Sequence, residues 1–349
     1  MTADLDRALL AWPLEVSLIT TFGTAGFMLL ATGGRVLDYP LTPGRLLLLW
    51  RVLAGVTFLA ALLVLLKLTA DMGGVSWRRA VALVPEVVTE THAGHVFEWL
   101  LPLALMVLLA ACVSLPYFIR TFALLILSGV LLFLQALLSH AIDKGALAVT
   151  VYFLHEVSAA LWVGALLAFW MVAQFEDPPC LWVKHGAQRV SRTALCSVIA
   201  LVITGTYTAY NGLGLDLYRL LFSVYGRTLV AKVAIFAAVL AIGAYNRFWL
   251  VPRIDEPGTF DALMRNILTE SVILLLAVLG LAVLLANTPP AHGMGGNSGH
   301  SMMAMFSGDA VRRRLRKLVS KTLLTAPSRG AASTKKLRFR RSWFSNRRE

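Results

Sequence analysis

The segment from Tyr152 to Trp170, YFLHEVSAALWVGALLAFW, limits the fold more than any other part of the chain. An apolar run of about 20 residues is long enough to cross a bilayer as a helix. His155 and Glu156 stand side by side within it, and an ionisable pair inside a membrane helix is costly enough to mark a candidate functional site. The alternative is a pair that neighbouring helices satisfy, with no ligand.

The same segment also contains a tryptophan and several small residues. Trp162 follows His155 by seven residues, or two helical turns, so the two side chains lie on roughly one face. Small residues along this helix should let another helix pack close against it: Ala159, Ala160, Gly164 and Ala165.

The whole chain has the composition of an integral membrane protein, because 58% of its 349 residues are hydrophobic and only 15% are charged. We expect an all-α, polytopic membrane helical bundle of about eight transmembrane helices, with no soluble domain. The expected spans are 14–32, 45–68, 95–112, 121–139, 146–172, 193–210, 228–249 and 267–287.

Two segments follow the predicted bundle of residues 1–290. Residues 291–310 form a flexible Met/His-rich segment, and residues 311–349 form a basic tail with 14 Lys or Arg residues. One stripe of the tail is apolar and predicts an amphipathic helix on an anionic membrane surface: Val311, Leu315, Leu318, Val319 and Leu323. Beside a membrane bundle, this basic tail does not favour nucleic-acid binding.

Several functional classes lack their motifs. The three cysteines are far apart, so they predict neither a disulfide framework nor a thiolate metal site. No phosphate-binding lysine loop, phosphorylated-aspartate sequence, catalytic Ser/His/Asp arrangement or zinc-protease spacing is evident. We therefore expect neither an ATP-driven pump nor an enzyme.

The histidines gather on one side of the predicted membrane. Eight spans place both ends of the bundle on one side, which we call the terminal face. Six of the seven histidines fall on or toward it: His92, His95, His140, His155, His292 and His300. His155 lies about 14 Å deep along its helix, and only His185 is predicted on the opposite face. This convergence is the strongest sequence indication of a metal-handling site.

Two local motifs add metal-binding side chains. In THAGHVFEW, a three-residue spacing keeps His92, His95 and Glu98 near one helix face, although interfacial histidines without a metal are the alternative. The segment AHGMGGNSGHSMMAM carries soft thioether ligands that favour Cu(I), and its alternative is a disordered tail of biased composition. Its candidate ligands are His292, Met294, His300, Met302, Met303 and Met305.

Four other charged residues fall within or near the spans: Arg51, Glu98, Lys232 and Glu270. Pairing among themselves is the simplest explanation for Arg51 and Lys232.

Short connections on the terminal face carry seven Lys or Arg residues against nine on the other side. Because the basic tail begins too far from the last span to count, this asymmetry places the terminal face outside the cytoplasm.

Five stretches resemble the copper resistance protein D (CopD) family of bacterial inner-membrane proteins. They are SHA at 139–141, LHEVSAALWVGALLAF at 154–169, RVSRTALCSVIALVITGTYTAY at 189–210, YGRTLVAKVAIFAAVLAIGAYNRFWLVPRI at 225–254 and LLANTPPA at 284–291. They define a CopD-like region of about 139–290. His92 and His95 depart from the family pattern, so the resemblance assigns them no role.

The resemblance implies copper uptake through the inner membrane, a periplasmic copper-binding partner and termini outside the cytoplasm. His140 and His155 are the matching positions that it carries over as copper ligands. We expect a membrane-level site for Cu(I) or Cu(II) built from His92, His95, His140 and His155, supported by Glu156, Glu98 and Trp162. Rival hypotheses are a haem-binding electron-transfer protein and a copper chaperone for cuproenzyme assembly.

Overall fold

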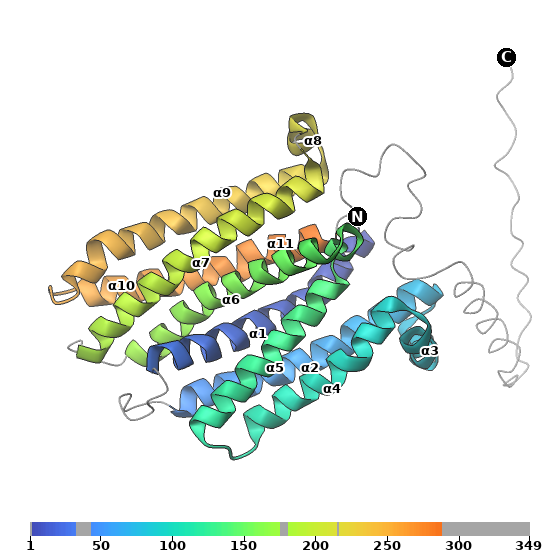
Figure 1. Cartoon of the computed structure of the whole chain (residues 1–349), viewed down its shortest axis with the longest axis horizontal. Coiled ribbons are helices and arrows are strands. Elements are labelled where there is room, and N and C mark those ends of the chain that lie inside the picture. Colours follow the sequence, from blue (N-terminus) through green and yellow to red (C-terminus); the bar gives the residue numbers. More distant parts are fainter. Residues whose placement is uncertain (1, 33–42, 175–180, 215, 288–349) are drawn as a thin grey trace, which may run out of the picture.

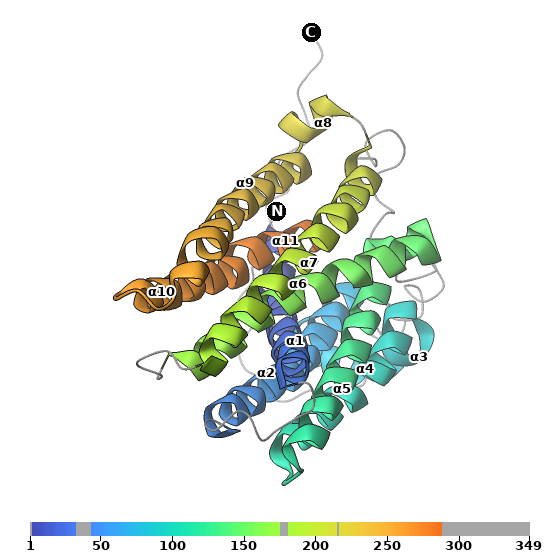
Figure 2. The same cartoon turned by 60° about the vertical axis from the view of Figure 1, so that its left-hand side comes forward.

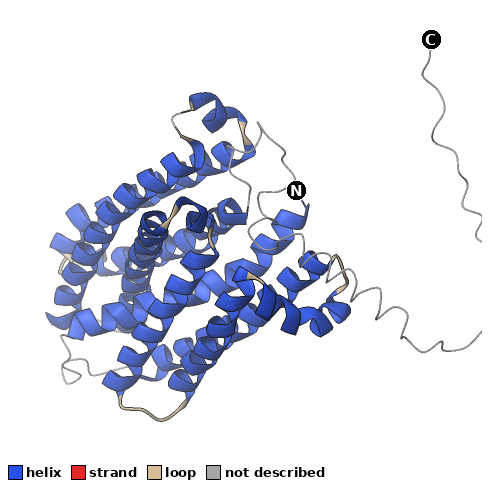
Figure 3. Ribbon diagram, turned by 45° about the vertical axis from the view of Figure 1, so that its right-hand side comes forward, coloured by secondary structure: helices blue, strands red, loops and turns tan. Residues whose placement is uncertain are grey.

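Helices form the whole described part of the chain. The computed structural model describes residues 2–32, 43–174, 181–214 and 216–287, and these contain helices and connecting turns with no strand (Figure 3). Eight helical segments are long and apolar enough to cross a membrane. The predicted all-α polytopic bundle is therefore confirmed, whereas the predicted Met/His segment and basic tail lie outside the described residues.

The first five spans are single helices, and most are longer than predicted. They are α1 (Thr2–Thr32), α2 (Pro43–Gly73), α4 (His92–Cys112), α5 (Tyr117–Leu138) and α6 (Ala146–Ala173).

Two of the remaining three spans include π-helical turns. Span six is α7 (Leu181–Leu213), and span seven joins α9 (Val224–Tyr245) to a π turn at Asn246–Leu250 and a 3-10 turn at Val251–Arg253. Span eight joins α10 (Thr259–Ile273), a π turn at Leu274–Val278 and α11 (Leu279–Asn287). Such turns are rare and often mark functional sites.

The two central helices are α1 and α6. Helix α1 packs against α2, α5, α6 and α11, while α6 also packs against α7 and α10 (Figures 1 and 2). Gly23 of α1 meets Gly164 of α6 so closely that a Cβ atom on either glycine would collide with the backbone of the other helix. The expected close approach at the small residues of α6 is thereby confirmed.

Both ends of the described bundle lie on one side of it. The start of α1 and the end of α11 are neighbours (Figure 1), and Trp12 Nε1 donates a 3.2 Å hydrogen bond to the Leu275 carbonyl. The connections after α2, α5 and α7 reach this same terminal face, as eight spans require. They include a 3-10 turn at His140–Lys144 and the short helix α8 (Leu217–Phe222).

Helix α3 (Trp77–Glu90) was not predicted. It is too short and too polar to span a membrane, but Ala80, Leu83 and Val87 form a buried stripe against neighbouring helices. Thr91 then ends α3 and caps α4, because its hydroxyl accepts a 2.9 Å hydrogen bond from the Gly94 amide. Span three consequently begins at His92 rather than His95.

Candidate functional site

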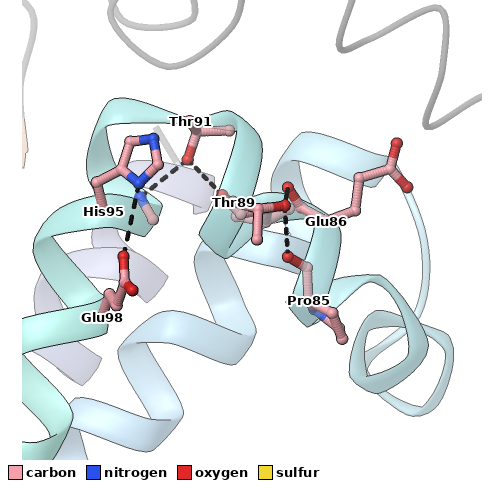
Figure 4. Close-up of polar contacts among 8 residues, drawn as sticks. Pro85, Glu86, Thr89, Thr91, His95 and Glu98 are labelled. Atoms are coloured by element: carbon pink, nitrogen blue, oxygen red, sulfur yellow. Dashed lines mark hydrogen bonds and ion pairs between the residues drawn. The ribbon is translucent and has the colours of Figure 1, made fainter.

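The two histidines of the THAGHVFEW motif lie on the exposed surface of the terminal face. His95 Nδ1 is 3.7 Å from Glu98 Oε2, one helical turn along α4 (Figure 4). His92 points toward the end of α5, where its Nε2 lies 3.4 Å from the Leu137 carbonyl. Each ring therefore contacts a different neighbour.

His140 lies just after the end of α5, beside the last turn of α11. Its ring lies against the backbone of Ala286, one residue before the end of α11, and its Nε2 is buried without a hydrogen-bond partner. Burial lowers the pKa of His140 below its usual value, although the nearby Asp143 carboxylate opposes that shift. A neutral imidazole with an unused nitrogen is the form that a metal ligand requires.

These histidines are not gathered into one site. No group of three or more His, Cys, Asp or Glu side chains in the described ranges is placed to hold a metal ion. His92, His95 and His140 lie at the terminal face and His155 within the bundle, so the structure does not bring together the four histidines expected as one site. His185 is exposed near the start of α7, on the opposite face.

His155 is held in a defined orientation by α7. Its Nδ1 lies 3.0 Å from Thr204 Oγ1, and the Thr204 hydroxyl lies 2.6 Å from the Ala200 carbonyl. Since that hydroxyl has a single proton and donates it to Ala200, it can only accept from His155. In the neutral ring, Nδ1 therefore carries the proton and Nε2 keeps a lone pair that can bind a metal.

Glu156 is buried beside His155, with 7% of the residue exposed. Its Oε2 atom has no hydrogen-bond partner, while the Tyr152 side chain, one turn earlier on α6, lies next to the carboxyl group. An unsatisfied buried oxygen is costly to maintain and suggests a functional use.

Three further polar residues complete what we call the outer polar cluster. Glu15 of α1 accepts a 3.1 Å hydrogen bond from Gln135 Nε2 of α5, and it interacts electrostatically with Glu156. Lys232 of α9 faces both Glu156 and His155. The cluster contains Glu15, Gln135, Tyr152, His155, Glu156, Thr204 and Lys232, drawn from five spans.

The charged residues singled out from the sequence have different partners. Lys232 is near Glu156, and Arg51 donates to the Ala111 carbonyl at 3.3 Å. Within the described spans, neither base therefore has the partner that mutual pairing had predicted, Glu98 or Glu270. The indole N–H of Trp162 donates to Glu270 Oε1 at 3.0 Å.

Sequence reasoning missed Glu15, Gln135 and Asn246. Glu15 and Gln135 were visible as single polar residues within apolar runs, AWPLEVSLI and LFLQALL, which is a usable signal. Their pairing was not visible, because they are 120 positions apart. Thr204 was noted as part of a motif, but its role depends on its distance from His155.

Comparison with known proteins places this arrangement in a family. Residues 184–285 match the family model described as copper resistance protein D, and residues 2–149 match that of the copper resistance protein D-like N-terminal domain. The chain belongs to the copper resistance protein D family. The match includes the first spans, where the quoted motifs gave little resemblance.

Two curated relatives are similar to this CopD family member. Copper resistance protein D of Pseudomonas syringae pv. tomato is 28% identical over 298 residues, covering 79% of this chain and 94% of the relative. Copper transport protein CutJ of Bacillus subtilis (strain 168) is 28% identical over 216 residues, covering 56% of this chain and 39% of the relative. No solved structure gave a significant match. These names point to copper resistance and transport rather than to an enzymatic reaction.

Proposed function

We propose that this CopD family member carries copper ions into the cell across the inner membrane. Copper would enter at the terminal face and bind at the outer polar cluster. The observation that supports the proposal is a pair of candidate ligand atoms on consecutive residues of α6: the unprotonated Nε2 of a neutral His155 and the unpartnered Oε2 of Glu156.

The chemistry of the outer polar cluster suits a cation. An imidazole nitrogen can bind either copper state, and carboxylates supply negative charge that offsets the cost of bringing a cation into a membrane. Lys232 lies near Glu156, so its positive charge can offset that carboxylate when copper is absent. An arriving cation would displace Lys232 from the carboxylate, and Lys232 would return when the cation leaves. Binding would therefore be reversible.

His140 is the proposed entry ligand. It lies beside the end of α11, immediately before the chain continues toward the Met/His segment of residues 291–310. That segment would collect copper and pass it to His140, and His140 would pass it to the deeper His155. A periplasmic copper-binding protein could deliver copper at the same face, where His92 and His95 are exposed.

Copper binding by the purified protein tests the proposed ligands. Changing His140 and His155 together to Ala should remove most membrane-level copper in a background that lacks residues 291–349. A Glu156→Gln variant should weaken binding without changing side-chain size. The matched control is His185→Ala, on the opposite face. Unchanged copper stoichiometry in the double variant would refute the ligand assignment.

Copper flux into vesicles tests transport itself. Reconstituted protein should accumulate copper inside vesicles, and the His155→Ala variant should not. Binding without accumulation would favour the chaperone hypothesis. An absorbance spectrum with haem bands would favour electron transfer instead.

A further inference from the structure

Glu270 is a buried carboxyl in the middle of the bundle, outside the outer polar cluster. Only 2% of the residue is exposed. It lies 11 residues from the start of its span, or about 17 Å from the opposite face. Its partner Trp162 lies 16 residues from the terminal-face end of α6, or about 24 Å. The carboxyl group is therefore far from water on either side.

Among the described residues, the hydrogen-bond partners of this carboxyl are neutral groups. Trp162 Nε1 donates to Oε1 at 3.0 Å, and Asn246 Nδ2 donates to Oε2 at 3.3 Å. Asn266 Nδ2 donates to Asn246 Oδ1 at 2.8 Å, which directs the Asn246 amide toward Glu270. Gly243 of α9 leaves room for the carboxyl, since a Cβ atom there would lie 3.3 Å from Oε1.

No cation among the described residues pairs with Glu270. The elements packed against α10 here are α6, α9 and the π turn at Asn246–Leu250. They place Trp162, Gly243 and Asn246 beside the carboxyl, and none of these residues carries a charge. The other ionisable groups of these elements lie elsewhere. Arg247 donates to Ser191, and Tyr245 stacks on Trp249. Arg227 of α9 and Asp261 and Arg265 of α10 are exposed, and Tyr225 lies against Gly212 of α7. The remaining groups belong to the outer polar cluster: Tyr152, His155, Glu156 and Lys232.

An aromatic pair lies between Glu270 and the outer polar cluster. Trp162 and Phe236 make an edge-on contact with ring centroids 5.6 Å apart. Phe236 is one turn beyond Lys232 on α9, and Trp162 is six residues beyond Glu156 on α6. Glu270 therefore occupies a second polar level, closer to the opposite face and flanked by the two π turns.

We propose that Glu270 is a proton-binding site within the membrane and that its proton is exchanged as copper crosses. A lone carboxylate at this depth needs a compensating positive charge. The described neighbours of Glu270 offer no thioether, thiolate or imidazole ligand, so the site suits a proton better than Cu(I). One O–H bond forms when water admitted from one face delivers a proton to the carboxylate, and it breaks when water admitted from the other face accepts that proton.

The coupling to copper rests on the proposed transport function, whereas proton binding does not. Infrared spectra of the full-length protein in lipid vesicles test proton binding directly. The wild type should show a protonated-carboxyl band that disappears in Glu270→Gln and persists in the matched control Glu98→Gln, which changes an exposed carboxylate. Glu270→Asp should restore a shifted band, which separates loss of the carboxyl from loss of the fold. A spectrum identical in wild type and Glu270→Gln, or a band that responds to sodium but not to pH, would overturn the assignment.

A flux measurement then tests coupling. Copper entry into vesicles containing a pH-sensitive dye should move protons in the opposite direction. This proton movement should fall at least tenfold in Glu270→Gln, while copper binding at the outer polar cluster is retained. Copper flux with unchanged proton movement would refute the coupling. An absence of copper flux in the wild type would refute the proposed transport and the coupling, and the infrared result would still decide whether Glu270 binds a proton.

Discussion

His155 Nδ1 lies 3.0 Å from Thr204 Oγ1, and the Thr204 hydroxyl is already committed to the Ala200 carbonyl. This pair of hydrogen bonds assigns the proton of the neutral imidazole to Nδ1 and leaves the Nε2 lone pair free, as the proposed copper ligand requires. In the proposed copper site Thr204 is thus a positioning residue, which acts through the orientation and tautomer of His155.

We predict that Thr204→Val weakens copper binding by roughly 10-fold or more, because valine keeps the shape of threonine but cannot accept the hydrogen bond. The control Thr204→Ser should retain near-normal affinity. Copper titration of both purified variants checks this, with thermal unfolding as the measure of folding. Equal affinities in the two variants would mean that Thr204 does not orient the ligand.

The close contact of α1 with α6 gives a second prediction, about stability. Gly164→Ala should destabilise the bundle by roughly 1–3 kcal/mol or more, because its Cβ would collide with the backbone of Gly23 and Thr24. The matched control is Gly55→Ala in α2, where the added Cβ meets no atom within 4 Å. Thermal unfolding in detergent compares them. Similar unfolding temperatures would show that the helices separate at little cost.

The fold was predictable because bilayer thickness imposes a length on each apolar run. Eight spans, antiparallel neighbours and both bundle ends on one face followed from that constraint. Helix α3 escaped prediction because its apolar stripe of Ala80, Leu83 and Val87 is too sparse to raise the average hydropathy. The π turns escaped because a single extra residue per turn leaves no periodic signal.

The candidate site was predictable only in part, for a geometric reason. Placing His140 and His155 toward the terminal face required only the count of spans. Finding their neighbours required knowing which helix faces meet, and Glu15, Thr204 and Lys232 reach His155 and Glu156 from other helices. Trp162 shows the same limit, since its real partner, Glu270, is 108 positions away.

Membrane orientation gives a third prediction. The asymmetry of basic residues in the short connections places both termini outside the cytoplasm. A reporter that is active only in the cytoplasm should therefore be silent when fused after Met305. The matched control is the same reporter inserted between α1 and α2, which should be active. An active reporter after Met305 would show that the basic tail governs topology.

The Met/His segment gives the last prediction, and it depends on ligand chemistry rather than on a preformed cage. Its many glycines make ordering costly, so the segment should bind copper loosely and raise its local concentration near His140. Replacing Met294, Met302, Met303 and Met305 with Leu keeps apolar bulk and removes the thioethers, which favour Cu(I) over zinc. Copper uptake should fall at low copper and be nearly normal at high copper, where capture no longer limits the rate. Equal loss at every concentration would place the segment in the permeation site, and no loss at any concentration would mean that it takes no part in capture.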